Sequence, residues 1–293
     1  KGQCGYEDDP FGFVQGLTTG AERYMFYLTG GDGAGDNHLK NIVRLGGSAS
    51  KLHLLLLLAA VNMDEQALTH LKALLESMVY YSTVNQIKTN ELERLYAQWC
   101  KQIREIHTDE ELTSFINNKI KPTISQWKVN NRSNFMRIGF DSMQQYRVKF
   151  ILARITKYVD VRRKNGGDAS NVAEFYEGGI EIEHIMPQKY SAAYGISEDD
   201  YNAAKQRLGN LTLLEKTINA SIGDDAFASK SKAYRQSAYY LTRSIAQLDD
   251  VGQQTAINRM NQKLMSSTSR RPSMIEHRQA ILYDLSEEIW SID

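Results

Sequence analysis

The sequence has few cysteines, no long hydrophobic run and no excess of either charge. Two cysteines occur in 293 residues, Cys4 and Cys100, and they lack the paired spacing of a disulfide scaffold or a zinc ribbon. This scarcity fits a reducing compartment, and we expect a cytoplasmic protein. The longest apolar run, residues 54–61, falls far short of the roughly 20 residues that a membrane helix needs. We interpret this run as part of a buried helix.

The charged residues balance, because Lys and Arg total 35 and Asp and Glu total 35. Net charge therefore gives no sign of nucleic-acid binding, although a local basic face would matter more than the total. Basic residues gather from Arg132 onward, and this group includes Arg154, Arg162, Arg163 and Lys164. Two interpretations stay open: a solvated face, or a rim that neutralises phosphates.

We expect three segments. Residues 1–49 stay unassigned, and their Gly- and Asp-rich stretch at 31–36 predicts a flexible loop. Residues 50–165 have the pattern of a helical scaffold domain, and residues 166–293 hold the site described below together with C-terminal helices. No signal peptide opens the chain, and its first residue is Lys1 rather than Met. We interpret it as a fragment whose upstream part is missing.

Helical periodicity dominates the sequence and predicts a mainly α fold, a helical bundle scaffold. Asp64 is placed to cap a helix running to about residue 81, and Thr108 with Glu111 forms a capping-box pattern. Pro122 is expected to end or restart the helix that follows. Further helices are predicted over residues 141–161, 225–248, 254–264 and 274–292. Strand-like alternation does not appear before about residue 179.

The stretch 178–219 departs from this helical pattern. Residues 180–185 alternate apolar and polar side chains, which predicts a half-buried strand ending near Pro187. Residues 211–214 predict a second strand, and a helix follows it. This strand pair and helix can bring four polar side chains to one point: Glu183, His184, Asn210 and Asn219.

Such a cluster suits phosphodiester hydrolysis. The carboxylate of Glu183 and the carboxamide oxygen of Asn219 are ligands that Mg²⁺ or Mn²⁺ accepts. A neutral His184 imidazole can take a proton from the attacking water, and Asn210 is expected to fix the imidazole tautomer. Each residue alone also has a plain structural explanation: a core or surface histidine, a turn asparagine and a helix cap. The combination favours the catalytic interpretation.

The segments IEHIMPQ, RLGNLTLLEKTIN and AFASKSKAYRQS together resemble the HNH nuclease domain of GmrSD-type, modification-dependent restriction enzymes and their SspE-like relatives. The resemblance covers about residues 145–290. It implies a small ββα-metal motif with one divalent ion, Mg²⁺ or Mn²⁺. His184 takes the place of the general base, Glu183 and Asn219 those of the metal ligands, and Asn210 that of the middle Asn. Lys230 is implied as a phosphate contact.

The resemblance also implies a biological setting. The chain would be the effector of an anti-phage restriction system that cuts or nicks foreign DNA, and a homodimer would favour double-strand cleavage. Its relatives carry a nucleotide-hydrolysing, modification-sensing domain, whose DGQQR-like motif does not occur in this sequence. Two alternatives remain open: a catalytically inactive adaptor that binds DNA or a protein, and an RNase on the same scaffold.

Overall fold

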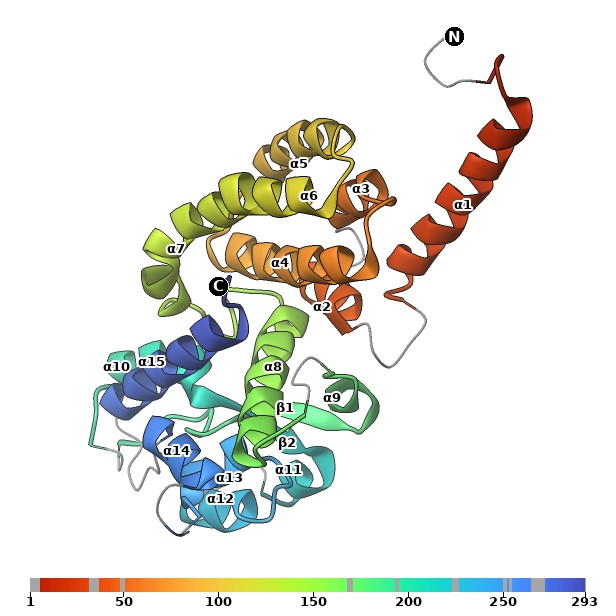
Figure 1. The fold of residues 1–293 in the computed structure, drawn as a ribbon. Helices are drawn as coiled ribbons and strands as arrows, with labels where there is room; N and C mark the ends of the chain where they lie inside the picture. The colour runs from red at the N-terminus through yellow and green to blue at the C-terminus, as the bar shows by residue number, and fades with distance from the viewer. Residues whose placement is uncertain are drawn as a thin grey trace. The chain divides into compact units, whose positions relative to one another are not determined.

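The computed structural model (Figure 1) describes residues 6–31, 37–47, 51–167, 171–192, 195–222, 227–249, 252, 255–264 and 272–292. The loop expected at 31–36 lies almost entirely outside these residues. The described residues fall into two compact units, one within residues 1–128 and one within 129–291. This partition differs from the three segments expected from the sequence, because the helix at 145–163 packs within the second unit.

The first unit is helical throughout its described part. Its helices pack against one another in pairs: α3 packs against α1, α4 and α5, and α2 packs against α4. Leu56, Leu71 and Leu75 are fully buried there, as the sequence pattern predicts. The elements are α1 (Pro10–Leu28), α2 (Asn37–Gly46), α3 (Leu52–Ala59), α4 (Glu65–Val84), α5 (Thr89–Ile103), α6 (Asp109–Phe115), a π-helix (Ile116–Ile120) and α7 (Lys121–Phe135), which runs on into the second unit.

The helix ends of this unit follow local sequence signals. Asp64 caps α4 by accepting from the Ala67 backbone N–H at 2.7 Å. Thr108 and Glu111 form the expected capping box at the start of α6. Pro122 is the second residue of α7, and the helical conformation runs without a break from the π-helix through it. It therefore neither ends nor restarts the helix, contrary to the prediction from the sequence pattern. The structure confirms the two predicted helix caps, at Asp64 and Thr108, each of which depends on a residue three positions further along the chain.

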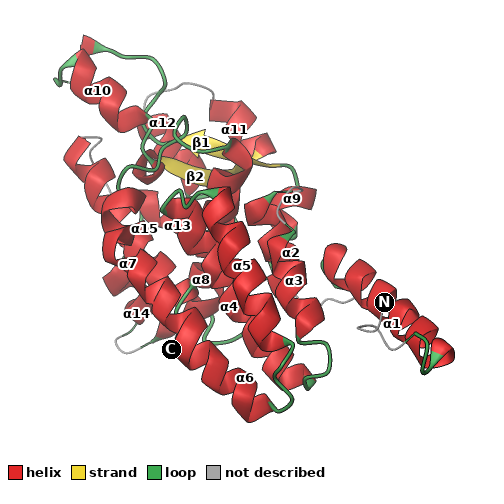
Figure 2. Cartoon of the chain, turned by 90° about the horizontal axis from the view of Figure 1, so that it is seen from above, coloured by secondary structure: helices red, strands yellow, loops and turns green. Residues whose placement is uncertain are grey.

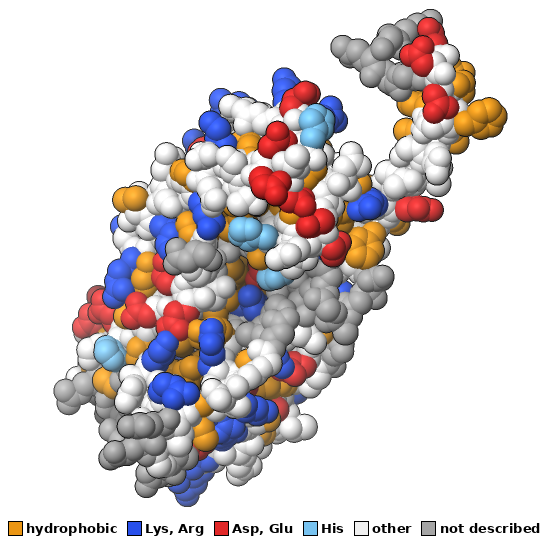
Figure 3. Space-filling model, viewed as in Figure 1, with side chains coloured by type: hydrophobic (Ala, Val, Ile, Leu, Met, Phe, Trp, Pro, Cys, Tyr) orange, Lys and Arg blue, Asp and Glu red, His pale blue; other side chains and the backbone are white. Residues whose placement is uncertain are grey.

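Helix α1 carries apolar side chains on its surface (Figure 3). Phe11 is 89% exposed, and Val14, Leu17 and Met25 are also exposed. Over the rest of the visible face, Lys and Arg side chains are interspersed with Asp and Glu side chains, in keeping with the balanced charge.

The second unit is built around α8 (Gln145–Arg163). Phe150, Ile151 and Ile155 of this helix are fully buried, and the helix packs against β2, α13, α14 and α15. The other elements are α9 (Glu174–Glu177), β1 (Ile180–His184), α10 (Glu198–Lys205), a 3-10 turn (Leu208–Asn210), β2 (Leu211–Glu215), α11 (Lys216–Ile222), α12 (Phe227–Tyr234), α13 (Tyr240–Ala246), α14 (Ala256–Lys263) and α15 (Pro272–Ile289).

Strands β1 and β2 pair antiparallel, with Ile180 opposite Glu215 and His184 opposite Leu211. In the described part of the chain they form a two-stranded sheet among helices (Figure 2), so the fold is mainly α. Helix α11 starts directly after β2, and the Lys216 N–H donates to the Gly179 carbonyl at 2.9 Å. The backbone therefore fixes α11 beside the first residue of β1.

Helix α15 holds the start of β2 in place. The buried guanidinium of Arg278 donates to the carbonyls of Gly209 and Leu211 at 2.8 and 2.7 Å. Gly209 packs so closely that an added Cβ would lie 2.1 Å from the Ile275 carbonyl oxygen. Glycine is required here because no side chain fits, and the contact places the next residue, Asn210.

One helix expected from the sequence is split in two. Residues 225–248 were predicted as a single helix, but α12 and α13 are separated by a turn at 235–239. The turn binds Glu215 at the end of β2, which accepts from the Ser237 hydroxyl at 2.9 Å and the Ala238 N–H at 2.7 Å. No described helix is both long and apolar enough to cross a membrane.

Candidate functional site

Three of the four predicted site residues line one cavity of about 600 Å³. Glu183 and His184 come from the end of β1, and Asn219 comes from α11. Glu181 and Lys230 lie in the same wall. Asn210, the fourth predicted residue, does not line this cavity.

Asn210 instead fixes the backbone around the site. Its side chain is fully buried. The Oδ1 atom accepts from the Met186 N–H at 2.7 Å, and Nδ2 donates to the Lys205 carbonyl at 2.7 Å. The Asn210 carbonyl also accepts from Ile185 N–H at 2.8 Å. Both ends of the carboxamide are thus bound to the backbone, so in this structure Asn210 holds the turn after His184 rather than the imidazole that the sequence assigned to it.

The imidazole of His184 is buried beside an aromatic ring. The Phe140 ring meets it edge-on, with centroids 5.0 Å apart and planes at 67°. Burial lowers the pKa of His184, and the Lys230 ammonium lowers it further, while Gln206 opposes both effects. Phe140 and Gln206 are themselves joined, because the Phe140 N–H donates to the Gln206 carbonyl at 2.6 Å. The environment therefore favours the neutral imidazole, the form that accepts a proton.

Glu183 is buried and already holds a cation. Its Oε1 atom accepts from Lys230 Nζ at 2.7 Å and from the Tyr234 hydroxyl at 3.0 Å. Lys230 also donates to the His184 carbonyl at 2.8 Å and is only 2% exposed. The ammonium therefore neutralises the carboxylate and fixes the end of β1. In this structure the Lys230 ammonium is bonded to Glu183 and to the His184 carbonyl. The phosphate contact expected of Lys230 stays a prediction.

Asn219 contacts a carboxylate that the sequence reasoning left aside. Its Nδ2 atom donates to Glu181 Oε2 at 2.9 Å. Glu181 and Glu183 are two residues apart on β1, so their side chains leave the strand on the same face. Each carboxylate has its own partner. Glu183 is paired with the ammonium of Lys230, and Glu181 accepts a hydrogen bond from the carboxamide of Asn219.

The cavity is lined by oxygen donors of the kind that hard divalent cations bind: Glu181, Glu183 and Asn219. Both hydrogen bonds to Glu183 fall on Oε1, and no bond to Oε2 is found among the described residues. Within the same residues, no group of three or more His, Cys, Asp and Glu side chains is arranged to hold a metal ion. An ion bound here would need the carboxamide oxygen of Asn219 and water in addition to a carboxylate, which is the ligand mixture typical of Mg²⁺.

The predicted basic rim separates into different environments. Arg154 is buried at 5% exposure, with its guanidinium 5.7 Å from the Trp290 ring centroid. Arg163 pairs with Asp249 at 2.9 Å and lies 4.6 Å from the Tyr240 ring centroid. Neither side chain is presented on the surface as a phosphate rim requires.

Arg162 and Lys164 are exposed. Arg162 stacks on Tyr158, 5.1 Å from the ring centroid, and lines a second cavity of about 580 Å³ with Arg259 and Lys263. These cations lie at the C-terminal end of α8 and on α14, and Lys263 is paired with Glu288. The phosphate contact expected of Arg162 and Lys164 stays a prediction.

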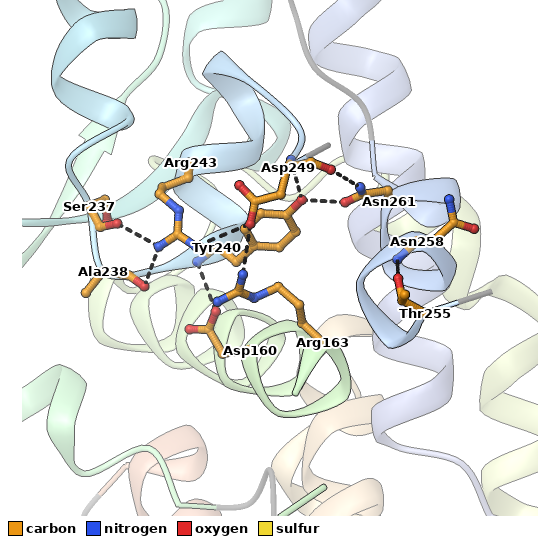
Figure 4. A network of polar contacts seen from close by, with 10 residues as sticks. All are labelled: Asp160, Arg163, Ser237, Ala238, Tyr240, Arg243, Asp249, Thr255, Asn258 and Asn261. Carbon is orange, nitrogen blue, oxygen red and sulfur yellow. Dashed lines mark hydrogen bonds and ion pairs between the residues drawn. The ribbon is translucent and has the colours of Figure 1, made fainter. Parts of the chain in front are cut away.

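Figure 4 shows why Arg163 is not available. Asp249, Tyr240 and Arg243 surround its guanidinium, and Asp160 accepts from the Tyr240 N–H at 2.9 Å. Arg243 donates to the carbonyls of Ser237 and Ala238 at 3.0 Å each. Asn261 closes the network by donating to the Asp249 carbonyl at 2.8 Å. Arg163 is thus a structural part of the second unit.

Sequence reasoning missed several residues around the cavity. Glu181 could have been found, because strand alternation places it on the same face as Glu183. Phe140 and Gln206 carry no such signal, since they reach His184 from loops far apart in the sequence. Tyr234 lies in the segment AFASKSKAYRQS, but its contact with Glu183 depends on how α12 packs.

Comparison with protein families finds a match to the second unit. Residues 127–266 match the family described as GmrSD restriction endonucleases, C-terminal domain. The matched stretch contains both strands and every candidate site residue named above. No curated protein matches the chain.

Proposed function

We propose that this chain, whose residues 127–266 match the family described as GmrSD restriction endonucleases, C-terminal domain, is a metal-dependent DNA endonuclease or nickase. The observation that carries the proposal is the shared cavity: a buried imidazole, a carboxylate and a carboxamide all line it. The reaction is hydrolysis of a phosphodiester bond at an HNH-type ββα site formed by β1, β2 and α11.

In this proposal His184 is the general base. It takes a proton from the water that attacks phosphorus, and its lowered pKa keeps the ring neutral and ready to accept that proton. The Phe140 ring and the Asn210-bound turn hold the ring in place. Asn210 thus contributes to catalysis through the backbone that carries the base.

Glu183 and Asn219 are the proposed ligands of a single Mg²⁺ or Mn²⁺. Such an ion, when bound, stabilises negative charge on the phosphate and the leaving oxygen. Lys230 holds the Glu183 side chain in place through the 2.7 Å ion pair to Oε1. Tyr234 adds a neutral hydrogen bond to the same oxygen, Oε1.

The substrate and setting follow from the family. We infer foreign or phage DNA as substrate, bound in part by Arg162 and Lys164, and a role as the effector of an anti-phage restriction system in the cytoplasm. Selection of modified DNA is assigned to a nucleotide-hydrolysing, modification-sensing partner domain or subunit. Homodimerisation would let two such sites cut both strands.

A plasmid-nicking assay tests the function. Wild type, His184→Ala and His277→Ala are incubated with supercoiled plasmid and Mg²⁺ or Mn²⁺. His277 is an exposed histidine of α15 outside the cavity and serves as the matched control. We expect His184→Ala to lose at least about 100-fold in rate, the usual range for a general base, and His277→Ala to retain the wild-type rate.

The other outcomes decide between the alternatives. Equal cutting by wild type and His184→Ala contradicts the role of His184. A parallel RNA substrate that is cut in place of DNA identifies an RNase. Binding of DNA without cleavage of either substrate under any metal identifies an inactive adaptor.

A further inference from the structure

We propose that Glu181 is the positioning residue that orients Asn219, so that the carboxamide presents Oδ1 rather than Nδ2 to a divalent cation. This inference rests on the proposed function, since it concerns the same ion. It begins from the 2.9 Å hydrogen bond between Asn219 Nδ2 and Glu181 Oε2.

An asparagine ligand has an orientation problem. Its carboxamide ends in one oxygen, which binds cations, and one NH₂ group, which repels them. Rotation of the amide by half a turn exchanges the two ends. An ionised carboxylate accepts hydrogen bonds only, so Glu181 can hold only the NH₂ end. The bond therefore selects the orientation in which Oδ1 is left for other partners.

The backbone fixes the two side chains relative to each other. Glu181 lies opposite Leu214 in the β1–β2 ladder, and α11 begins immediately after β2. The 2.9 Å bond from Lys216 N–H to the Gly179 carbonyl ties the first turn of α11 to the residue before β1. Asn219 is one helical turn further on, so the contact with Glu181 follows from the register of the strands.

The partners of the two β1 carboxylates assign them different tasks. Glu183 is neutralised by Lys230, which holds one carboxylate oxygen. The side-chain hydrogen-bond partner of Glu181 in the described part of the chain is the Asn219 amide, and the Lys149 ammonium acts on Glu181 through space. A negative charge beside the amide also makes the NH₂ end the favoured neighbour on electrostatic grounds.

The test measures Mn²⁺ affinity directly, by electron paramagnetic resonance titration or calorimetry of the full chain. We expect Glu181→Ala to weaken Mn²⁺ binding roughly 10-fold to 100-fold, the range seen when the partner of a metal ligand is removed. Glu181→Gln should lose less affinity than Glu181→Ala, because its carboxamide oxygen can still accept from Asn219, although its own NH₂ end no longer excludes the reversed orientation. Glu276→Ala removes an exposed carboxylate of α15 outside the cavity and should change nothing.

The same measurement in an Asn219→Asp variant distinguishes orientation of residue 219 by Glu181 from direct binding of the ion by Glu181. Asp at position 219 has two equivalent oxygens and needs no orienting partner. In Asn219→Asp, the further change Glu181→Ala should therefore cost no affinity and should relieve repulsion between the two carboxylates. Circular dichroism and urea unfolding verify that each variant folds.

Three results would overturn the inference. Glu181→Gln losing as much affinity as Glu181→Ala would make Glu181 a charged ligand itself. An equal loss in the wild-type and Asn219→Asp backgrounds would also contradict orientation. Absence of Mn²⁺ binding to the wild type would remove the basis of the inference. A different result separates this inference from the proposed function. If wild type and His184→Ala cut plasmid equally while the Glu181 variants show the expected Mn²⁺ affinities, the role of His184 in the proposed nuclease is contradicted and the orientation of Asn219 by Glu181 still holds.

Discussion

Two polar clusters of the second unit use the same ingredients in different surroundings. In one, Lys230 pairs with Glu183 at 2.7 Å and Tyr234 adds a hydroxyl. In the other, Arg163 pairs with Asp249 at 2.9 Å beside Tyr240 (Figure 4). Each combines a cation, a carboxylate and a tyrosine, but only the first forms part of the wall of the Glu183–His184 cavity.

The two clusters differ in what their polar groups contact. In the Asp249 cluster, the backbone N–H donates to the Tyr240 hydroxyl at 3.0 Å and the carbonyl accepts from Asn261 at 2.8 Å. The carboxylate holds Arg163. These bonds join loops and helices to one another. In the Glu183 cluster, Glu183, Lys230 and the neighbouring His184 line a cavity. A cluster that only binds itself stabilises the fold, and one that borders a cavity can also bind a ligand.

The largest expected effect is that of Lys230→Met. This change leaves Glu183 buried without its cation, and breaking a buried ion pair by removing one partner costs about 3–5 kcal/mol. Urea unfolding of the full chain measures the loss. The double variant Glu183→Gln/Lys230→Met is the control, because a neutral Gln still accepts from Tyr234, and it should recover more than half of the loss. A cost below about 1 kcal/mol for the single variant would show that Glu183 finds another partner.

A matched pair of hydroxyl deletions sharpens the comparison further. Tyr234→Phe and Tyr240→Phe each remove one buried hydroxyl and should each cost about 1–3 kcal/mol of stability. Only Tyr234→Phe should also lower the rate of plasmid cleavage, measured under conditions where both variants are fully folded. If Tyr240→Phe slowed cleavage equally, the network of Figure 4 would have to be coupled to the cavity.

The smallest effect is expected from adjacent arginines. Arg162→Glu should weaken DNA binding severalfold and reduce the dependence of log affinity on log salt by about one, because a phosphate contact is lost. Arg163→Glu should instead lower stability, since it breaks the pair with Asp249, and should leave the salt dependence of the folded protein unchanged. Fluorescence anisotropy at several salt concentrations distinguishes the two. Identical slopes for both variants would contradict a phosphate contact by Arg162.

Much of the secondary structure could be predicted because its signals are local. The caps at Asp64 and Thr108 act over three residues, and the alternation from Ile180 to His184 identifies β1 without reference to any other element. The turn between α12 and α13 was missed for the opposite reason. It exists because Ser237 and Ala238 bind Glu215, which lies more than 20 residues earlier in the chain.

The sequence by itself determined which chemical groups gather at the end of the strand pair: a carboxylate, an imidazole and a carboxamide, because strand period and chain order bring them there. Only the tertiary structure decided what each one touches. It turned Asn210 toward the backbone, placed Lys230 against Glu183 and Glu181 against Asn219, and paired Arg163 with Asp249 while leaving Arg162 exposed. The physical reason is range. Caps and periodicity arise between neighbours, whereas hydrogen-bond partners are chosen among atoms that are distant in the sequence and meet only when the helices pack.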